Sequence, residues 1–399
     1  MDYRQIRGQE IAQTKQIEKQ KNGWFVPSQT TGQKYFVDEN FVCNCPDSQY
    51  REKTCKHAFA VRYYLQKETE TPRGVKTDKV RLTYKQAWGA YNRAQKGEIT
   101  LFDKLLRDLA QEVEEPAYRF GRPRLSLQET VFCSIQKVYS QLSSRRAYSL
   151  FGKATDNGLI NHTPYYNAVS AFLNTDATTP ILMSLVGLSA APLKSVESSF
   201  AVDSTGFRTT SFCMYACAKY GLKKQHKWIK AHACVGTKTN VITALAITGE
   251  DGADSPQFAD LVKNTAETFD VQEVSADKAY SSRENHALVK SLGGQAFIPF
   301  KSNATGRSGG SLAWRKAFLY FQLKADEFYQ HYHKRSNVES AFSSIKAKFG
   351  DSLKSKSHNA QVNELLCKVI AYNIVVLIHE MEELNISPNF AEGVKALPS

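Results

Sequence analysis

Long apolar segments and an ordered cysteine framework are both missing from this chain of 399 residues. The opening segment, MDYRQIRGQEIAQTKQIEKQ, is polar and has no apolar core, so we expect no secretory signal. The longest apolar run, VIAYNIVVLI, is about half the length that a membrane-spanning helix requires. Eight cysteines spread over this length do not resemble a disulfide framework, which favours a reducing cytoplasm.

Acidic residues are outnumbered by basic ones, 39 against 52, and the net charge is +13. A charge of this sign and size favours a polyanionic partner, with nucleic acid first and an acidic membrane surface second. Internal repeats and long low-complexity tracts are absent, and the length allows two or three domains.

Four potential zinc ligands, Cys43, Cys45, Cys55 and His57, lie in one short segment as C-x-C-x9-C-x-H. Zinc prefers four such ligands in a tetrahedron, and two ligand pairs joined by a loop supply them. Alternating aromatic and polar residues over 24–42 predict a hairpin before them. The segment resembles the SWIM zinc-binding module, which is associated with DNA or protein binding. The scattered cysteines are expected to be core residues: Cys133, Cys213, Cys217, Cys234 and Cys367.

A polar stretch at 66–79 reads as a linker, and the pattern from there to residue 190 is mostly helical. Within it, Arg122 and Arg124 belong to a short basic element, YRFGRPRLSL, that is suited to an A·T-rich minor groove. The alternative is a linker capped into the next helix at Ser126. The following helices fit a helix-turn-helix-like unit with the last helix as reader. A simple helical bundle between two domains is the alternative there.

The pattern changes near residue 196 to short apolar strands that alternate with helices. This alternation predicts an α/β sheet with helices packed on its faces. A closing apolar helix over 359–384 is expected to be largely buried. Strands are predicted over 198–207, 226–248 (as a hairpin), 271–280 and 294–300, and helices over 255–269 and 281–292.

Two aspartates occupy positions that a purely structural sheet does not favour. Asp203 and Asp277 each lie at or near the end of a predicted strand, where open α/β sheets place their ligand sites. Aspartate has a poor strand propensity, so both placements need an explanation. For Asp277 a turn or a helix N-cap is a real competitor.

The segment YHKRSNVESAFSSIK, residues 332–346, lacks glycine and proline and predicts one amphipathic helix. At about 100° per residue, Tyr332, Arg335, Glu339 and Lys346 share one face, beside a separate apolar face. An ordinary solvated face with an Arg335–Glu339 pair is the alternative.

If Asp203, Asp277 and Glu339 converge, they offer hard oxygen ligands suited to Mg²⁺ or Mn²⁺. Two such ions can activate water on one side and stabilise a leaving oxygen on the other. In a basic protein the substrate that best fits this chemistry is a phosphodiester.

These residues carry a family resemblance. Asp203 in AVDSTGF, Asp277 in SADKAYSS and the spacing Tyr-x2-Arg-x3-Glu-x6-Lys resemble the insertion-sequence DDE transposases of bacteria and archaea. The resemblance covers residues 196–380. It implies a ribonuclease-H-like fold, Mg²⁺-dependent cleavage at the ends of a mobile element, and strand transfer into target DNA. It also implies that Asp203, Asp277 and Glu339 are the metal ligands and that Tyr332, Arg335 and Lys346 contact the transposon end.

One departure from some relatives concerns the interval between the second aspartate and the glutamate. A helix, a strand and a helical stretch fill it, which leaves no room for the long β-rich insertion those relatives carry. Features tied to that insertion, such as hairpin intermediates at the DNA ends, are therefore not expected to transfer.

The resulting prediction has three domains: a small zinc-binding α+β module (1–70), a helical DNA-binding region (71–195) and an α/β ribonuclease-H-like catalytic domain (196–399). Expected cofactors are Mg²⁺ or Mn²⁺, and Zn²⁺. Expected partners are double-stranded DNA, both transposon ends and target, and a second copy of the chain in the DNA complex, with no membrane. The expected location is the prokaryotic cytoplasm, at the nucleoid. Competing functions are a non-catalytic DNA-binding regulator, which would tolerate loss of an acid, and a metal-dependent nuclease without strand transfer.

Overall fold

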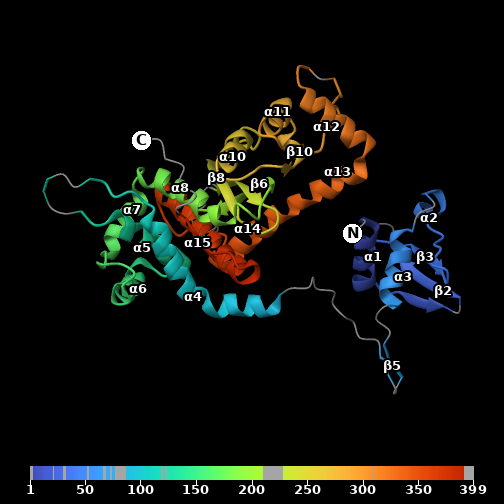
Figure 1. Cartoon of the computed structure of the whole chain (residues 1–399), viewed down its shortest axis with the longest axis horizontal. Coiled ribbons are helices and arrows are strands. Elements are labelled where there is room, and N and C mark those ends of the chain that lie inside the picture. The colour runs from blue at the N-terminus through green and yellow to red at the C-terminus, as the bar shows by residue number, and fades with distance from the viewer. Residues whose placement is uncertain are drawn as a thin grey trace, which may run out of the picture. The chain divides into compact units, whose positions relative to one another are not determined.

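The computed structural model describes residues 3–20, 22–29, 33–51, 54–65, 69–71, 74–76, 87–117, 120–121, 124–209, 228–307 and 309–390. The chain divides into two compact units, Met1–Gln86 and Ala87–Ser399 (Figure 1).

The first unit is a small α+β structure. Its antiparallel sheet has the order β1-β2-β3, and the β2–β3 pair confirms the predicted hairpin. Helices α1 and α3 approach closely at Gly8, where a Cβ atom would lie 2.5 Å from Cβ of Phe59. The elements are α1 (Tyr3–Thr14), β1 (Glu18–Gln20), β2 (Gly23–Pro27), β3 (Lys34–Asp38), α2 (Pro46–Arg51), α3 (Lys56–Leu65), β4 (Thr69–Thr71) and β5 (Gly74–Lys76).

The second unit contains a mixed sheet of five described strands in the order β10-β9-β6-β7-β8. Strands β6, β7 and β8 form an antiparallel meander, and β9 and β10 add to it in parallel with β6. A sheet of this order with helices against it is the predicted ribonuclease-H-like α/β fold. The strands are β6 (Ser199–Arg208), β7 (Trp228–Gly236), β8 (Ile242–Gly249), β9 (Glu273–Ala276) and β10 (Gln295–Phe297).

Helices pack on both faces of this sheet, because side chains alternate between the faces along each strand. Helix α14 contacts β6 and β7, while α10 contacts β7 and β8 and α11 contacts β10. Helices α12 and α13 extend past the sheet (Figure 1). The helices after β8 are α10 (Gln257–Ala266), η2 (Lys278–Tyr280), α11 (Arg283–Ser291), α12 (Leu312–Leu323), α13 (Ala325–Tyr332), η3 (His333–Arg335), α14 (Ser336–Phe349) and α15 (His358–Leu384).

The helical region before the sheet shares one hydrophobic core with it. Helix α15 packs against α4, α5, α7 and α8, and α8 packs against β8. The helical and α/β regions, which the sequence predicts as separate domains, therefore form one compact unit. The helices before the sheet are α4 (Trp88–Gln111), α5 (Leu127–Ser140), α6 (Ser144–Asp156), α7 (Tyr166–Asn174), α8 (Thr178–Ala190) and η1 (Ala191–Leu193).

Helix α15 is the buried closing helix that the sequence predicts. Length and composition alone would let it cross a membrane, but 89% of its most apolar window is buried inside the fold. Its Asn373 accepts from the backbone of Ile242 at 2.9 Å and donates to the side chain of Ser189 at 2.9 Å. The helix is thus fixed by the sheet and by α8 together.

The segment 332–346 is not the single helix that its pattern predicts. Helix α13 ends at Tyr332, a 3₁₀ turn covers His333–Arg335, and α14 begins at Ser336. The apolar face of α14 is buried as expected, through Val338, Ala341, Phe342, Ile345 and Phe349. The turn itself contains Arg335, one of the four residues of the predicted charged face.

Candidate active site

Asp203 and Asp277 follow directly after a pair of neighbouring residues in two parallel strands. Val202 of β6 is in register with Ala276 of β9, the last residue of that strand. The two aspartates therefore lie at the same level along two adjacent strands. Strand β6 continues to Arg208 along β7, so Asp203 lies in the middle of its strand and not at the predicted end. The neighbouring strand, β9, ends at Ala276, so its pairing with β6 stops at Val202, directly before Asp203.

Asp277 also caps the short helix that follows. Its Oδ1 accepts from the backbone N–H of Lys278 at 2.6 Å. The alternative of a helix N-cap is therefore confirmed for Asp277. The other oxygen of this carboxylate does not take part in the capping hydrogen bond.

Glu339 approaches the same edge from the first turn of α14. The link between helix and strand is Arg335, which donates to Oδ2 of Asp203 and, at 2.7 Å, to Oε1 of Glu339. The side chains of Arg335 and Asp203 are each 22% exposed, whereas that of Glu339 is 61% exposed. The predicted Arg335–Glu339 pair is thus present, but Arg335 also pairs with Asp203 of β6 and so connects α14 to the sheet.

The electrostatics confirm that these groups gather at one place. Burial raises the pKa of Asp203, and the charges of Glu339 and Asp277 raise it further. The backbone N–H of Ser204 and the Arg335 guanidinium oppose this rise in pKa. A carboxylate whose pKa is raised by neighbouring carboxylates in this way favours the binding of a cation.

Tyr332 faces the same group of charges. Burial raises the pKa of its hydroxyl, and Arg335 lowers it while Asp277 and Asp203 raise it. Its ring packs edge-on against Tyr329 at 6.0 Å. Tyr332, Arg335 and the three acids therefore belong to one site.

Lys346 lies further along α14 and reaches β6 two residues beyond Asp203. Its Nζ donates to Oγ1 of Thr205 at 2.7 Å and lies 5.3 Å from the ring centroid of Phe207. Burial lowers the pKa of this amine. The sequence interpretation missed Thr205, although the polar run after Asp203 in β6 was the available signal.

The exposed side of α14 borders an open groove of about 550 Å³. Most of its lining side chains are small, which permits close approach of another molecule. The residues lining it are Ser336, Glu339, Ser340, Ser343, Ser344 and Ala347.

The basic element before α5 is described only in part, because Arg122 lies outside the described residues. Arg124 is exposed, and two residues later Ser126 caps α5 by accepting from the N–H of Glu129. Glu115 reinforces this start by accepting from the Ser126 hydroxyl at 2.5 Å. The capped-linker interpretation is therefore correct for Ser126.

The four predicted zinc ligands come together in the first unit. Cys43, Cys45, Cys55 and His57 are all buried, and their ligand atoms lie within 4.8 Å of one another. Zinc–sulfur bonds of about 2.3 Å place tetrahedral ligands roughly 3.8 Å apart, so this spacing needs only a small contraction. Nε2 of His57 is buried without a hydrogen-bond partner among the described residues. Of the other cysteines, Cys213 and Cys217 lie outside the described residues, and the rest are buried.

Three carboxylates converge at one place in a ribonuclease-H-like fold, two from parallel strands and one from a helix. This arrangement defines a class of metal-dependent enzymes that act on phosphodiesters. Two of these carboxylates, Asp203 and Glu339, already bind one cation, the Arg335 guanidinium, and the hard oxygens of the three acids fit a divalent ion.

Residues 194–374 match the family model described as a transposase DDE domain. A transposase of this kind cleaves DNA with divalent metal ions and transfers the cut strand into target DNA, and the match indicates this function for the chain. No solved structure matches the chain.

Proposed function

We propose that Asp203, Asp277 and Glu339 hold the catalytic ions, Mg²⁺ or Mn²⁺, of a Tyr-Arg-Glu-Lys-type transposase that acts at insertion-sequence ends. The observation that carries this assignment is the bridge from Asp203 through Arg335 to Glu339. The register of Val202 with Ala276 adds Asp277 beside Asp203, which supports grouping the three acids in one site.

The ions, when bound, activate the attacking oxygen and stabilise the leaving one. The chain's own residues hold the DNA in place. Arg335 and Lys346 carry the positive charge for phosphate, and Tyr332 lies beside Arg335. The small residues of the groove along α14 allow a DNA backbone to reach Glu339 closely.

The cysteine and histidine cluster supports a structural zinc ion in a SWIM-type module. Four protein ligands leave no open position, so this ion takes no part in the reaction. We assign recognition of specific ends, or assembly of a homodimer on them, to residues 1–70. Arg122, Arg124 and the helices of 71–195 add contacts to double-stranded DNA, and 196–399 carry the chemistry. The setting is the prokaryotic cytoplasm at the nucleoid.

The test uses isosteric variants that remove one charge each: Asp203→Asn, Asp277→Asn and Glu339→Gln. Each should abolish Mg²⁺-dependent cleavage of end DNA while the thermal unfolding midpoint and end binding persist. Asp270→Asn, which replaces an exposed acid after α10, is the matched control and should cleave normally. A triad variant with near-normal cleavage would remove that residue from the set of ligands.

The same assays separate the competing functions. Cleavage without joining to a target would indicate a nuclease, and end binding by the wild type without any cleavage would indicate a regulator. The presence of all three acids argues against a regulator, and the Tyr-Arg-Glu-Lys spacing disfavours a nuclease.

A further inference from the structure

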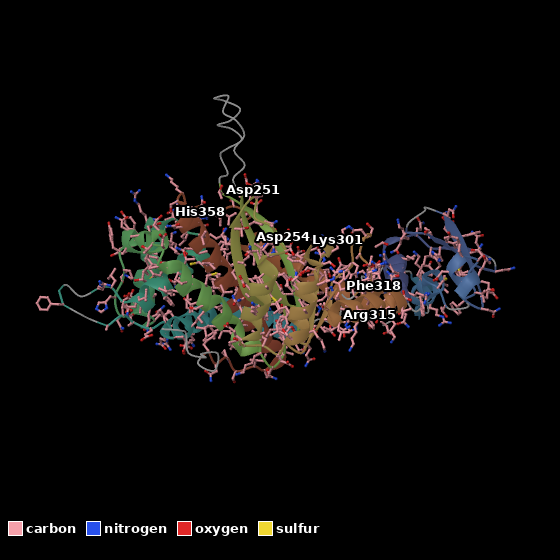
Figure 2. The ribbon with its side chains drawn as sticks, turned by 90° about the horizontal axis from the view of Figure 1, so that it is seen from above. Asp251, Asp254, Lys301, Arg315, Phe318 and His358 are labelled. Atoms are coloured by element: carbon pink, nitrogen blue, oxygen red, sulfur yellow. The ribbon has the colours of Figure 1, made fainter. Side chains whose placement is uncertain are left out.

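A second polar cluster lies on the other face of the sheet, behind Asp203. It is built around Asp254, which follows β8 in the chain (Figure 2). Nζ of Lys230 lies 2.7 Å from Oδ1 of Asp254, and Nδ1 of His232 lies 3.2 Å from the same oxygen. The other ring nitrogen of His232 lies 2.9 Å from Oγ1 of Thr248.

The strand register explains how these residues meet. His232 of β7 stands opposite Ser204 of β6, and Lys230 stands opposite Thr248 of β8. Paired residues share a face of the sheet, so Ser204, His232 and Lys230 face away from Asp203. His232 is fully buried and Lys230 is 24% exposed on its side chain, which makes this a built cluster and not a solvated ion pair.

Ser204 connects the cluster to the active site. Its backbone N–H donates to Oδ1 of Asp203 at 2.8 Å. Its side chain lies on the other face opposite His232, whose Nδ1 lies 3.2 Å from Asp254. Burial acts to raise the pKa of Asp254, but Lys230 and then Ser204 outweigh it, so this pKa lies below its usual value.

Tyr280 is the second connection. It is 1% exposed, and its hydroxyl makes no hydrogen bond of standard geometry within the described residues. Burial raises the pKa of this hydroxyl, and the charges of Asp254, Asp203 and Asp277 raise it further. The tyrosine side chain is therefore buried near the carboxylate of the rear cluster and near the two aspartates of the active site.

We propose that Asp254 is a positioning residue of the transposase reaction: it pairs with Lys230 and lies against His232, and with Ser204 and Tyr280 it forms the layer behind Asp203 and Asp277. We treat Asp254 as a residue behind the ligands and not as a ligand, because it lies on the opposite face from Asp203 and contacts Lys230 and His232 there, although these contacts lack standard hydrogen-bond geometry. The inference rests on the proposed assignment of Asp203 and Asp277 as metal ligands. Partners behind metal ligands fix the orientation of those ligands, and their removal typically weakens metal binding by 10–100-fold.

The experiment measures Mn²⁺ affinity by calorimetry on the full chain, together with the Mg²⁺ dependence of end cleavage. Asp254→Asn and Ser204→Ala should weaken Mn²⁺ binding about tenfold and raise the half-saturating Mg²⁺ concentration similarly. The cleavage rate at saturating Mg²⁺ should stay near that of the wild type. Ser204→Thr, which keeps the hydroxyl, should restore the affinity. Tyr280→Phe should act in the same direction as Ser204→Ala, and it serves as a second probe if Asp254→Asn does not fold.

Glu197→Gln is the matched control, since Glu197 is a buried acid at the other end of the same strands, where it accepts from Thr239 and Lys238. It should lower the thermal midpoint without changing Mn²⁺ affinity. If Asp254→Asn behaves like Glu197→Gln, its role is structural and the inference fails. If Asp254→Asn lowers the number of Mn²⁺ ions bound, Asp254 is a ligand and the inference also fails. Failure of the proposed function differs from both, because the triad variants would then still cleave.

Discussion

Arg335 donates a hydrogen bond to Asp203, a residue 132 positions earlier in the chain. The same guanidinium reaches Glu339, so one positive charge joins two of the acids that we propose as ligands of a divalent ion. Burial acts to lower the pKa of Arg335, and Asp203 foremost raises it above its usual value. In the absence of metal this residue is the counter-ion of the site, and with DNA present it is the residue assigned to phosphate.

Arg335→Ala should therefore have opposite effects on the two ligands. Without a competing cation, Mn²⁺ should bind at least tenfold more tightly in the absence of DNA, which corresponds to about 1.4 kcal/mol. Binding to transposon-end DNA should weaken, because a phosphate contact is lost. Calorimetry with Mn²⁺ and fluorescence anisotropy with end DNA measure both effects on one preparation.

Arg335→Lys is the control, since it keeps the charge but cannot donate to two carboxylates in the same planar geometry. We expect intermediate values for both ligands. Weaker Mn²⁺ binding by Arg335→Ala would mean that Arg335 organises the acids and does not compete for them.

The sheet and its acids were largely predictable from the sequence. Short apolar strands and intervening helices predict the α/β sheet, and polar residues at strand positions identify Asp203 and Asp277.

Other features depend on contacts that no local pattern contains. The 3₁₀ turn at His333–Arg335 contains no glycine or proline that would predict it, and the ion pair of Lys334 with Glu273 helps hold it against β9. The merging of the helical region with the sheet depends on α15, whose buried polar residues bond to distant elements. The cluster around Asp254 comes from three separate segments, each of which reads locally as an ordinary strand or turn.

Lys346 should contribute to DNA binding through its charge. Its alanine variant should flatten the dependence of log affinity on log salt by about one unit. Lys348→Ala is a close control on the same helix, because Nζ of Lys348 is neutralised by Glu98 at 2.6 Å. That variant should leave the slope unchanged. Equal slopes for Lys346→Ala and the wild type would place Lys346 in a structural role on Thr205.

His286 should make the second unit sensitive to acid. It is 2% exposed and stacks against Phe300, and burial lowers its pKa to about 4. The unfolded chain binds a proton at this histidine more readily than the folded chain does, so acid favours unfolding. The free energy of unfolding is therefore unaffected by His286 above about pH 6.5 and decreases as the pH falls towards 4. At pH 5 the loss should reach about 2 kcal/mol. Denaturant unfolding of His286→Gln should show a correspondingly weaker pH dependence.

His358→Gln, at an exposed position on α15 (Figure 2), is the control and should keep the wild-type pH dependence. If His286→Gln keeps it as well, the acid sensitivity of this unit originates elsewhere.

The two units of the chain should have separate roles, and the proposed zinc cluster of the first unit allows this to be tested. Cys55→Ser removes one of four ligands from a unit whose core is small, so its folding should depend on the metal. We expect loss of zinc and of specific end binding, while Mg²⁺-dependent nicking of random DNA persists, because the acids lie in a unit with its own core. Cys133→Ser, at a buried cysteine of that second unit, should keep its zinc. Full zinc content in Cys55→Ser would refute the ligand assignment, and loss of nicking with residues 87–399 still folded would refute the division of roles.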